Sequence, residues 1–139
     1  MIILDTNVIS EFMLPKPDDR VTRWLDRQPS LSLWTTSVTI FEVRFGLETM
    51  PAGKRRTTLM TSFENWLNQV VQQRIAVYDE AAARCAAELA AERRRRGQPG
   101  ELRDTMIAGI VVSSHATLAT RNVKHFHDIA RYVVSPWEP

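Results

Sequence analysis

Short apolar runs alternate along this chain with longer stretches of helical periodicity. Short apolar runs are typical of buried strands, and apolar positions spaced by three and four are typical of helices with one buried face. Strands are predicted at 2–4, 31–36, 75–78, 117–120 and 132–134. Helices are predicted around 8–12 and 21–25, and at 38–48, 59–73, 80–96 and 102–114, with one helical turn at 122–126.

This alternation favours a mostly parallel sheet covered by helices on both faces. Thr36 or Ser37 is expected to cap the helix that follows the second strand, and Asp79 the helix after the third. Residues 51–58 are polar and are expected to be a connection. Because no linker or repeat divides the chain, we expect a single three-layer α/β/α domain over residues 1–139.

The first candidate for chemistry is Asp5, which directly follows the apolar run 2–4. In open α/β sheets, ligands bind just beyond the carboxyl ends of the strands. A turn residue or a helix cap would also explain an Asp at this position. Taken alone, these structural interpretations of Asp5 are favoured.

Glu42 is a second candidate, on the helix expected at 38–48. It shares a stripe with Val38 and is flanked by Phe41 and Phe45, so it is expected on the buried face, where an ionised carboxylate is costly without a partner. A capping box from Thr39 to Glu42 is the alternative.

Asp104 and Asn122 complete the set of candidates. Asp104 leads the apolar stripe of the helix at 102–114, although an acid in a first turn is also favoured by the helix dipole. Asn122 follows the strand at 117–120 much as Asp5 follows the first strand, with an ordinary turn as the alternative.

Three carboxylates sharing a pocket would raise one another's pKa values unless a cation compensated them. Oxygen ligands without Cys or an obligatory His fit Mg²⁺ or Mn²⁺. Such a cation can polarise a phosphoryl oxygen and activate water, so the residues suggest metal-assisted phosphodiester hydrolysis.

The amino-acid composition indicates the class of protein and the compartment in which this chemistry would occur. The chain is 44% hydrophobic and 24% charged with a net charge of +2, as in an ordinary globular protein that permits a polyanionic partner without requiring one. The single Cys85 excludes an internal disulfide and a Cys-based zinc site. With no signal peptide or membrane span visible, we expect a cytoplasmic protein.

Four motifs occur in an order that resembles PIN-domain proteins, in particular the VapC and FitB toxins of type II toxin–antitoxin pairs. They are MIILDTNVISE (1–11), SVTIFE (37–42), DTMIAG (104–109) and LATRNVKHF (118–126), and the ending SPW (135–137) is similar to the FitB-like subgroup. The resemblance covers essentially the whole chain. It implies a Mg²⁺- or Mn²⁺-dependent endoribonuclease, with tRNA as the expected substrate.

The resemblance also implies roles and partners. Asp5, Glu42 and Asp104 match the family's metal-binding acids, and Asn122 falls where the family has Asp or Asn. Thr6 and Thr120 lie beside these positions and would orient ligands or water, and Asn7, two residues after Asp5, is expected to support that acid. A homodimer is implied, inhibited by a small antitoxin in a heterotetramer or larger complex that binds operator DNA through the antitoxin.

This chain departs from the family pattern at several positions. Asn122 lowers the charge of the pocket by one, which makes a single metal plausible. His125 stands where Asp is frequent, Gly109 replaces a usual Ala, and Arg103 could either pair with Asp104 or point away.

One further cluster and two rival functions remain open. The run Arg93, Arg94, Arg95, Arg96 could be a solvated helix end or a contact to RNA or an acidic partner. An aspartyl-phosphate phosphatase of the haloacid dehalogenase type would normally need Asp at the position of Asn7. A non-catalytic partner in an antitoxin–DNA complex is the other alternative.

Overall fold

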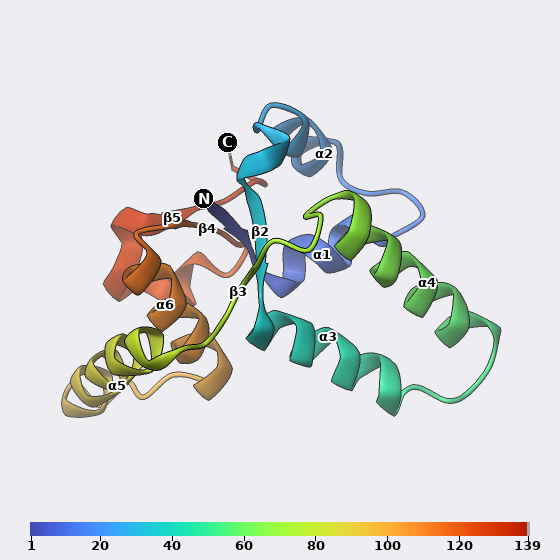
Figure 1. Cartoon of the computed structure of the whole chain (residues 1–139). Coiled ribbons are helices and arrows are strands. Elements are labelled where there is room, and N and C mark those ends of the chain that lie inside the picture. Colours follow the sequence, from blue (N-terminus) through green and yellow to red (C-terminus); the bar gives the residue numbers. More distant parts are fainter. Residues whose placement is uncertain (139) are drawn as a thin grey trace.

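The computed structural model describes residues 1–138, and Pro139, the last residue of the expected domain, lies outside the described residues. Five strands form one parallel sheet in the order β3-β2-β1-β4-β5 (Figure 1). Each lies within a predicted segment. The strands are β1 (Ile2–Leu4), β2 (Leu33–Thr36), β3 (Ile75–Ala76), β4 (Thr117–Ala119) and β5 (Val133–Val134).

Helices cover both faces of this sheet, which confirms the three-layer architecture (Figure 1). One layer contains α1 (Thr6–Phe12), α2 (Asp19–Asp26), α4 (Lys54–Gln69) and most of α3 (Ser37–Thr49). The other contains α5 (Glu80–Arg95), α6 (Leu102–Ser114) and the 3₁₀ segment η2 (Val123–Tyr132). A 3₁₀ turn, η1 (Ser30–Ser32), occupies the expected start of the second strand.

The polar connection predicted at 51–58 is wrong beyond Gly53. The helix α4 begins at Lys54, directly after Gly53. The φ angle of Gly53 is 155°, a value that glycine adopts much more readily than other residues. The first turns of α4 are polar because they face solvent, so their composition resembles that of a loop. The same helix ends at Gln69, four residues before the predicted end.

The core is divided by the sheet into two apolar layers. Successive side chains of β1 point to opposite faces, so Leu4 packs with α1 and α4 while Ile3 packs with α6. Both are fully buried, as expected for a strand in the middle of a parallel sheet. Within residues 1–138, no helix has the length and apolar character needed to cross a membrane.

The helices α5 and α6 approach each other closely at Gly109. A Cβ atom added there would lie 2.7 Å from Cβ of Ala86 and 2.9 Å from its backbone nitrogen, and closer still to the carbonyl oxygen of Ala82. Glycine is therefore required by backbone packing at this position, which gives a physical reason for its departure from the family pattern.

The basic run at the end of α5 is not one continuous surface. Arg93 is buried, and its guanidinium donates to both carboxylate oxygens of Asp128 at 2.7 and 2.8 Å and to the hydroxyl of Thr105 at 2.8 Å. The predicted RNA or partner contact is therefore wrong for Arg93, which joins α5, α6 and η2. Arg95 and Arg96 are exposed and pair with Glu92 of the same helix.

Replacing Gly109 by Ala is expected to destabilise the fold. The added methyl group would force α5 away from α6, a kind of overpacking that typically costs about 1–3 kcal/mol. Gly46→Ala is the matched control, because a Cβ there meets nothing within 4 Å. That variant should gain up to about 1 kcal/mol from helix propensity. Chemical denaturation measures both; equal effects of the two substitutions would contradict the close approach.

Replacing Asp128 by Ala is expected to cost about 3 kcal/mol at neutral pH, because it leaves the buried guanidinium of Arg93 without its partner. Hydrogen bonds from Arg93 lower the pKa of Asp128. The contribution of Asp128 to the free energy of unfolding is therefore complete above the ordinary aspartate pKa and is lost as pH falls through the lowered value. The denaturation curves of the wild type and Asp128→Ala should therefore converge in strong acid. Arg84→Ala, which breaks an exposed pair with Glu80, should change stability little.

Candidate functional site

The candidate site lies at the carboxyl edge of the sheet, where β1 and β4 are neighbours. The chain moves outward from β1 to β2 and β3 on one side, and from β4 to β5 on the other. The loops that leave β1 and β4 therefore diverge and open a crevice, the usual ligand position in open α/β sheets. Asp5 follows β1 and Thr120 follows β4 at this point.

Asp5 is buried, with 4% of its surface exposed, and three donors surround its carboxylate. The Thr120 hydroxyl donates at 2.8 Å, the Thr6 backbone N–H at 2.8 Å and the Asn7 amide at 3.4 Å. The bond from Thr6 makes Asp5 the N-cap of α1, so the cap interpretation is correct. A second carboxylate oxygen is held between Thr120 and Asn7, which a simple cap does not require.

Glu42 reaches the site from α3. The N-cap of α3 is Thr36, whose hydroxyl accepts from the Thr39 backbone N–H, so the alternative capping box from Thr39 to Glu42 is wrong. Instead, the Thr6 hydroxyl donates to Glu42 at 3.2 Å. The expected buried flanks are also wrong, since Phe41 and Phe45 are 58% and 54% exposed. Glu42 lies at the edge of the core and opens onto the pocket.

Asp104 lies in the first turn of α6. The N-cap of the helix is Glu101, whose carboxylate accepts from the Asp104 backbone N–H at 3.0 Å. The side chain of Asp104 is therefore free of the capping role, and its Oδ2 is 3.1 Å from Nδ1 of His125. Arg103 does not pair with Asp104; it lies 3.3 Å from Glu101 and 4.0 Å from Glu42.

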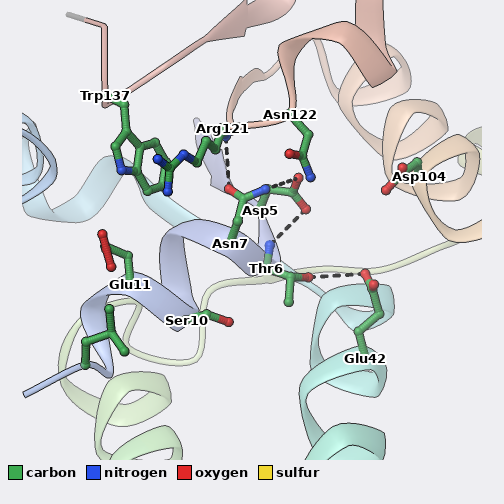
Figure 2. A pocket seen from close by; sticks show the side chains of 11 residues that line it. Asp5, Thr6, Asn7, Ser10, Glu11, Glu42, Asp104, Arg121, Asn122 and Trp137 are labelled. Carbon is green, nitrogen blue, oxygen red and sulfur yellow. Dashed lines mark hydrogen bonds between the residues drawn. The ribbon is translucent and has the colours of Figure 1, made fainter. Parts of the chain in front are cut away.

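One open pocket of about 470 Å³ brings these side chains together (Figure 2). The carboxylates of Asp5, Glu42 and Asp104 and the amide of Asn122 border it, as do Thr6 and Asn7. Thr120 is buried beneath, where its hydroxyl accepts from the Asn122 backbone N–H at 3.0 Å and from the Asn7 amide at 3.2 Å. The acids and the amide named from the sequence thus border one pocket, and Thr6, Asn7 and Thr120 contact them directly, whereas Arg93 to Arg96 are not among the residues that line it.

Burial is the largest cause raising the pKa of each of the three acids. The charge of Asp104 raises the pKa of Asp5 further, and the charges of Asp5 and Asp104 raise that of Glu42. Hydrogen bonds from Thr120 and Thr6 oppose the shift at Asp5. The pocket is therefore a region where negative charge is crowded and incompletely compensated.

Carboxylate and amide oxygens in this setting fit a hard divalent cation. Within residues 1–138, no three His, Cys, Asp or Glu side chains converge closely enough to form a complete metal site. Mg²⁺ does not require such a cage, because it keeps several waters and binds through one or two carboxylates together with substrate phosphates. The donor set and its crowded charge therefore suit a partly hydrated Mg²⁺ or Mn²⁺.

Part of the pocket wall consists of residues that were not predicted from the sequence. Ser10 and Glu11 line it from α1, on the helix face that Asn7 also occupies, and this periodicity was available in the sequence. Arg121 and Trp137 line it on the side away from Glu42 and Asp104 (Figure 2). Arg121 lies between Thr120 and Asn122, so its position along the chain was a signal, whereas no local pattern placed Trp137 there.

The comparisons with known proteins agree with this fold. The PIN domain family matches residues 2–132. The chain is 37% identical to VapC ribonuclease Y4jK of Sinorhizobium fredii, covering 100% of this chain and 99% of the relative. It is 31% identical to toxin FitB of Neisseria gonorrhoeae, with 99% of each covered. A tRNA(fMet)-specific endonuclease VapC of Shigella flexneri is 27% identical over 97% of this chain and 96% of the relative.

A solved structure of FitAB bound to an IR36 DNA fragment is similar over nearly the full length. Its TM-score is 0.87 at 31% sequence identity, and the match covers 99% of this chain and 96% of that chain. The likeness includes the five-stranded parallel sheet and the helices on both of its faces. The chain therefore belongs to the PIN domain family, among the relatives of the VapC and FitB toxins.

Proposed function

We propose that this protein is a metal-dependent endoribonuclease, the toxin of a type II toxin–antitoxin pair. The observation that carries the proposal is the pocket in which Asp5, Glu42, Asp104 and Asn122 meet at the carboxyl edge of the sheet. Relatives named as a VapC ribonuclease and as a tRNA(fMet)-specific endonuclease support RNA as the substrate and tRNA as the first RNA to test.

Each side chain of the pocket has a distinct task in the proposed reaction. Asp5, Glu42 and Asp104 would hold Mg²⁺ or Mn²⁺, which when bound activates water and stabilises charge on the scissile phosphate. Thr120 and Asn7 keep the carboxylate of Asp5 oriented through their hydrogen bonds. Thr6 orients Glu42. The amide of Asn122 offers an oxygen or a donor without adding charge.

We further propose that an antitoxin controls this activity. Solved structures of FitAB and VapBC with DNA are similar to this chain, which supports an antitoxin partner and operator DNA bound in the complex. A homodimer of the toxin, within a heterotetramer or larger complex with the antitoxin, is the assembly to be tested. The uncomplexed toxin is the form expected to cleave RNA.

Replacing Asp104 by Asn is expected to reduce Mg²⁺-dependent RNA cleavage by about 100-fold or more, since even partners of metal ligands contribute about 10–100-fold. The change keeps the size of the side chain and an oxygen facing His125. Pure protein is incubated with total RNA and with tRNA, with Mg²⁺ or a chelator. Asp19→Asn, an acid in the first turn of α2, should cleave normally.

If Asp104→Asn cleaved RNA as the wild type does, the assignment of Asp104 as a metal ligand would be wrong. A wild-type protein that cleaves no RNA with either Mg²⁺ or Mn²⁺ would instead favour the non-catalytic alternative.

Replacing Glu42 by Gln is expected to raise the metal-free melting temperature at neutral pH. The raised pKa of Glu42 means that its ionised form destabilises the fold, and Gln removes that charge. The folded state binds the proton more tightly, so the gain should shrink as pH falls through the raised pKa.

Excess Mg²⁺ should stabilise the wild type more than Glu42→Gln, because a ligand of the folded state stabilises it by an amount that grows with the logarithm of the ligand concentration divided by Kd. Differential scanning fluorimetry with and without Mg²⁺ measures both effects. Glu88→Gln, at an exposed position of α5, is the matched control and should behave as the wild type. Equal Mg²⁺ stabilisation of Glu42→Gln and the wild type would argue against Glu42 as a ligand.

A further inference from the structure

The cation Arg121 lies on the side of the pocket that is away from two of the three candidate metal ligands. Glu42 and Asp104 lie on one side of Asp5, whereas Arg121 and Trp137 lie on the other, together with a fourth acid, Glu11 (Figure 2). A strand of RNA brings one negative charge per nucleotide to this pocket, and the acids alone would repel it. A cation at the opposite side is therefore the feature that a polyanionic substrate needs.

The side chain of Arg121 packs against the ring of Trp137. Its guanidinium carbon lies 5.0 Å from the centre of the Trp137 ring, within the range of a cation–π contact. Trp137 is 5% exposed, and its backbone carbonyl accepts from Arg20 at 3.0 Å. Arg121 is an exposed residue, and an arginine packed against an aromatic ring can still donate its N–H groups to an oxyanion.

The backbone of Arg121 is connected to the catalytic side of the pocket. Its N–H donates to the side-chain oxygen of Asn7 at 3.0 Å, and the amide nitrogen of Asn7 donates to Asp5. A single side chain thus joins the backbone of Arg121 to Asp5, while the guanidinium at the end of the Arg121 side chain lies against Trp137.

The charge of Arg121 is not consumed by an ion pair. Within the described part of the chain, none of the ion pairs includes Arg121. Asp18, whose pKa is lowered in part by Arg121, is already paired with Arg20 through two oxygens. Arg103, the cation on the acidic side, contacts Glu101 and Glu42 instead.

We propose that Arg121 binds the phosphate of a nucleotide next to the scissile bond and so sets the position of the RNA strand across the pocket. This inference rests on the proposed function of the pocket and adds a substrate-binding residue to it. Arg121 contacts the substrate and not the acids, so it acts on binding of RNA more than on the chemical step.

The test compares Arg121→Gln and Arg121→Lys with the wild type in RNA cleavage. Losing a charged hydrogen bond to phosphate should raise KM about tenfold in Arg121→Gln and leave kcat within about twofold. Arg121→Lys keeps the charge and should recover part of this loss. Arg84→Gln removes one positive charge from the exposed surface of α5 and should leave KM unchanged.

Binding without cleavage separates this inference from the proposed function. The probe is a labelled single-stranded oligoribonucleotide with 2′-O-methyl sugars, titrated in the presence of a chelator at several salt concentrations. Arg121→Gln should bind about tenfold more weakly than the wild type, and the slope of log affinity against log salt should fall by about 0.7.

Each outcome has one interpretation. If Arg121→Gln binds the oligonucleotide as the wild type does, or if Arg84→Gln is equally impaired, the assignment of Arg121 is overturned even when the wild type cleaves RNA. If the wild type binds RNA through Arg121 but does not cleave it, the assignment is supported and the nuclease proposal fails. A wild type that neither binds the oligonucleotide nor cleaves RNA with Mg²⁺ or Mn²⁺ overturns both.

Discussion

The hydrogen bonds to the buried carboxylate of Asp5 are the interaction on which the rest of the site depends. A buried acid keeps its charge only where donors or a cation surround it. Here Thr6, Asn7 and Thr120 supply three donors from two segments, the start of α1 and the end of β4. These bonds join the two segments where the sheet order diverges, so the same contacts orient the acid and close the floor of the pocket.

Two of these donor residues also form hydrogen bonds to other residues of the pocket. Thr6 uses its backbone N–H for Asp5 and its hydroxyl for Glu42, whereas Asn7 uses its amide nitrogen for Asp5 and its amide oxygen for the backbone of Arg121. One short segment thus positions an acid from α3 and a cation from the β4 loop. Crowded charge remains on the acidic side, and the raised pKa values show that the protein alone does not compensate it.

Features encoded locally were predictable, and those that depend on distant contacts were not. The five strands followed from apolar runs, and Asp5, Asp104 and Asn122 from their places at element ends. The start of α4 was missed because Lys54 and its neighbours are polar on a solvent-exposed helix. The burial of Arg93 could not be predicted from its neighbours in the chain, because its partner, Asp128, lies 35 residues away in sequence.

Anomalous diffraction from crystals soaked in Mn²⁺ tests the central claim most directly, since it locates the cation without relying on activity. We predict a Mn²⁺ peak in the pocket, with the Asp5 carboxylate as a ligand and Glu42 or Asp104 contacting the ion directly or through water. Crystals that show no peak beside Asp5, or a peak only at another site such as His125, would contradict the assignment of this pocket as the metal centre.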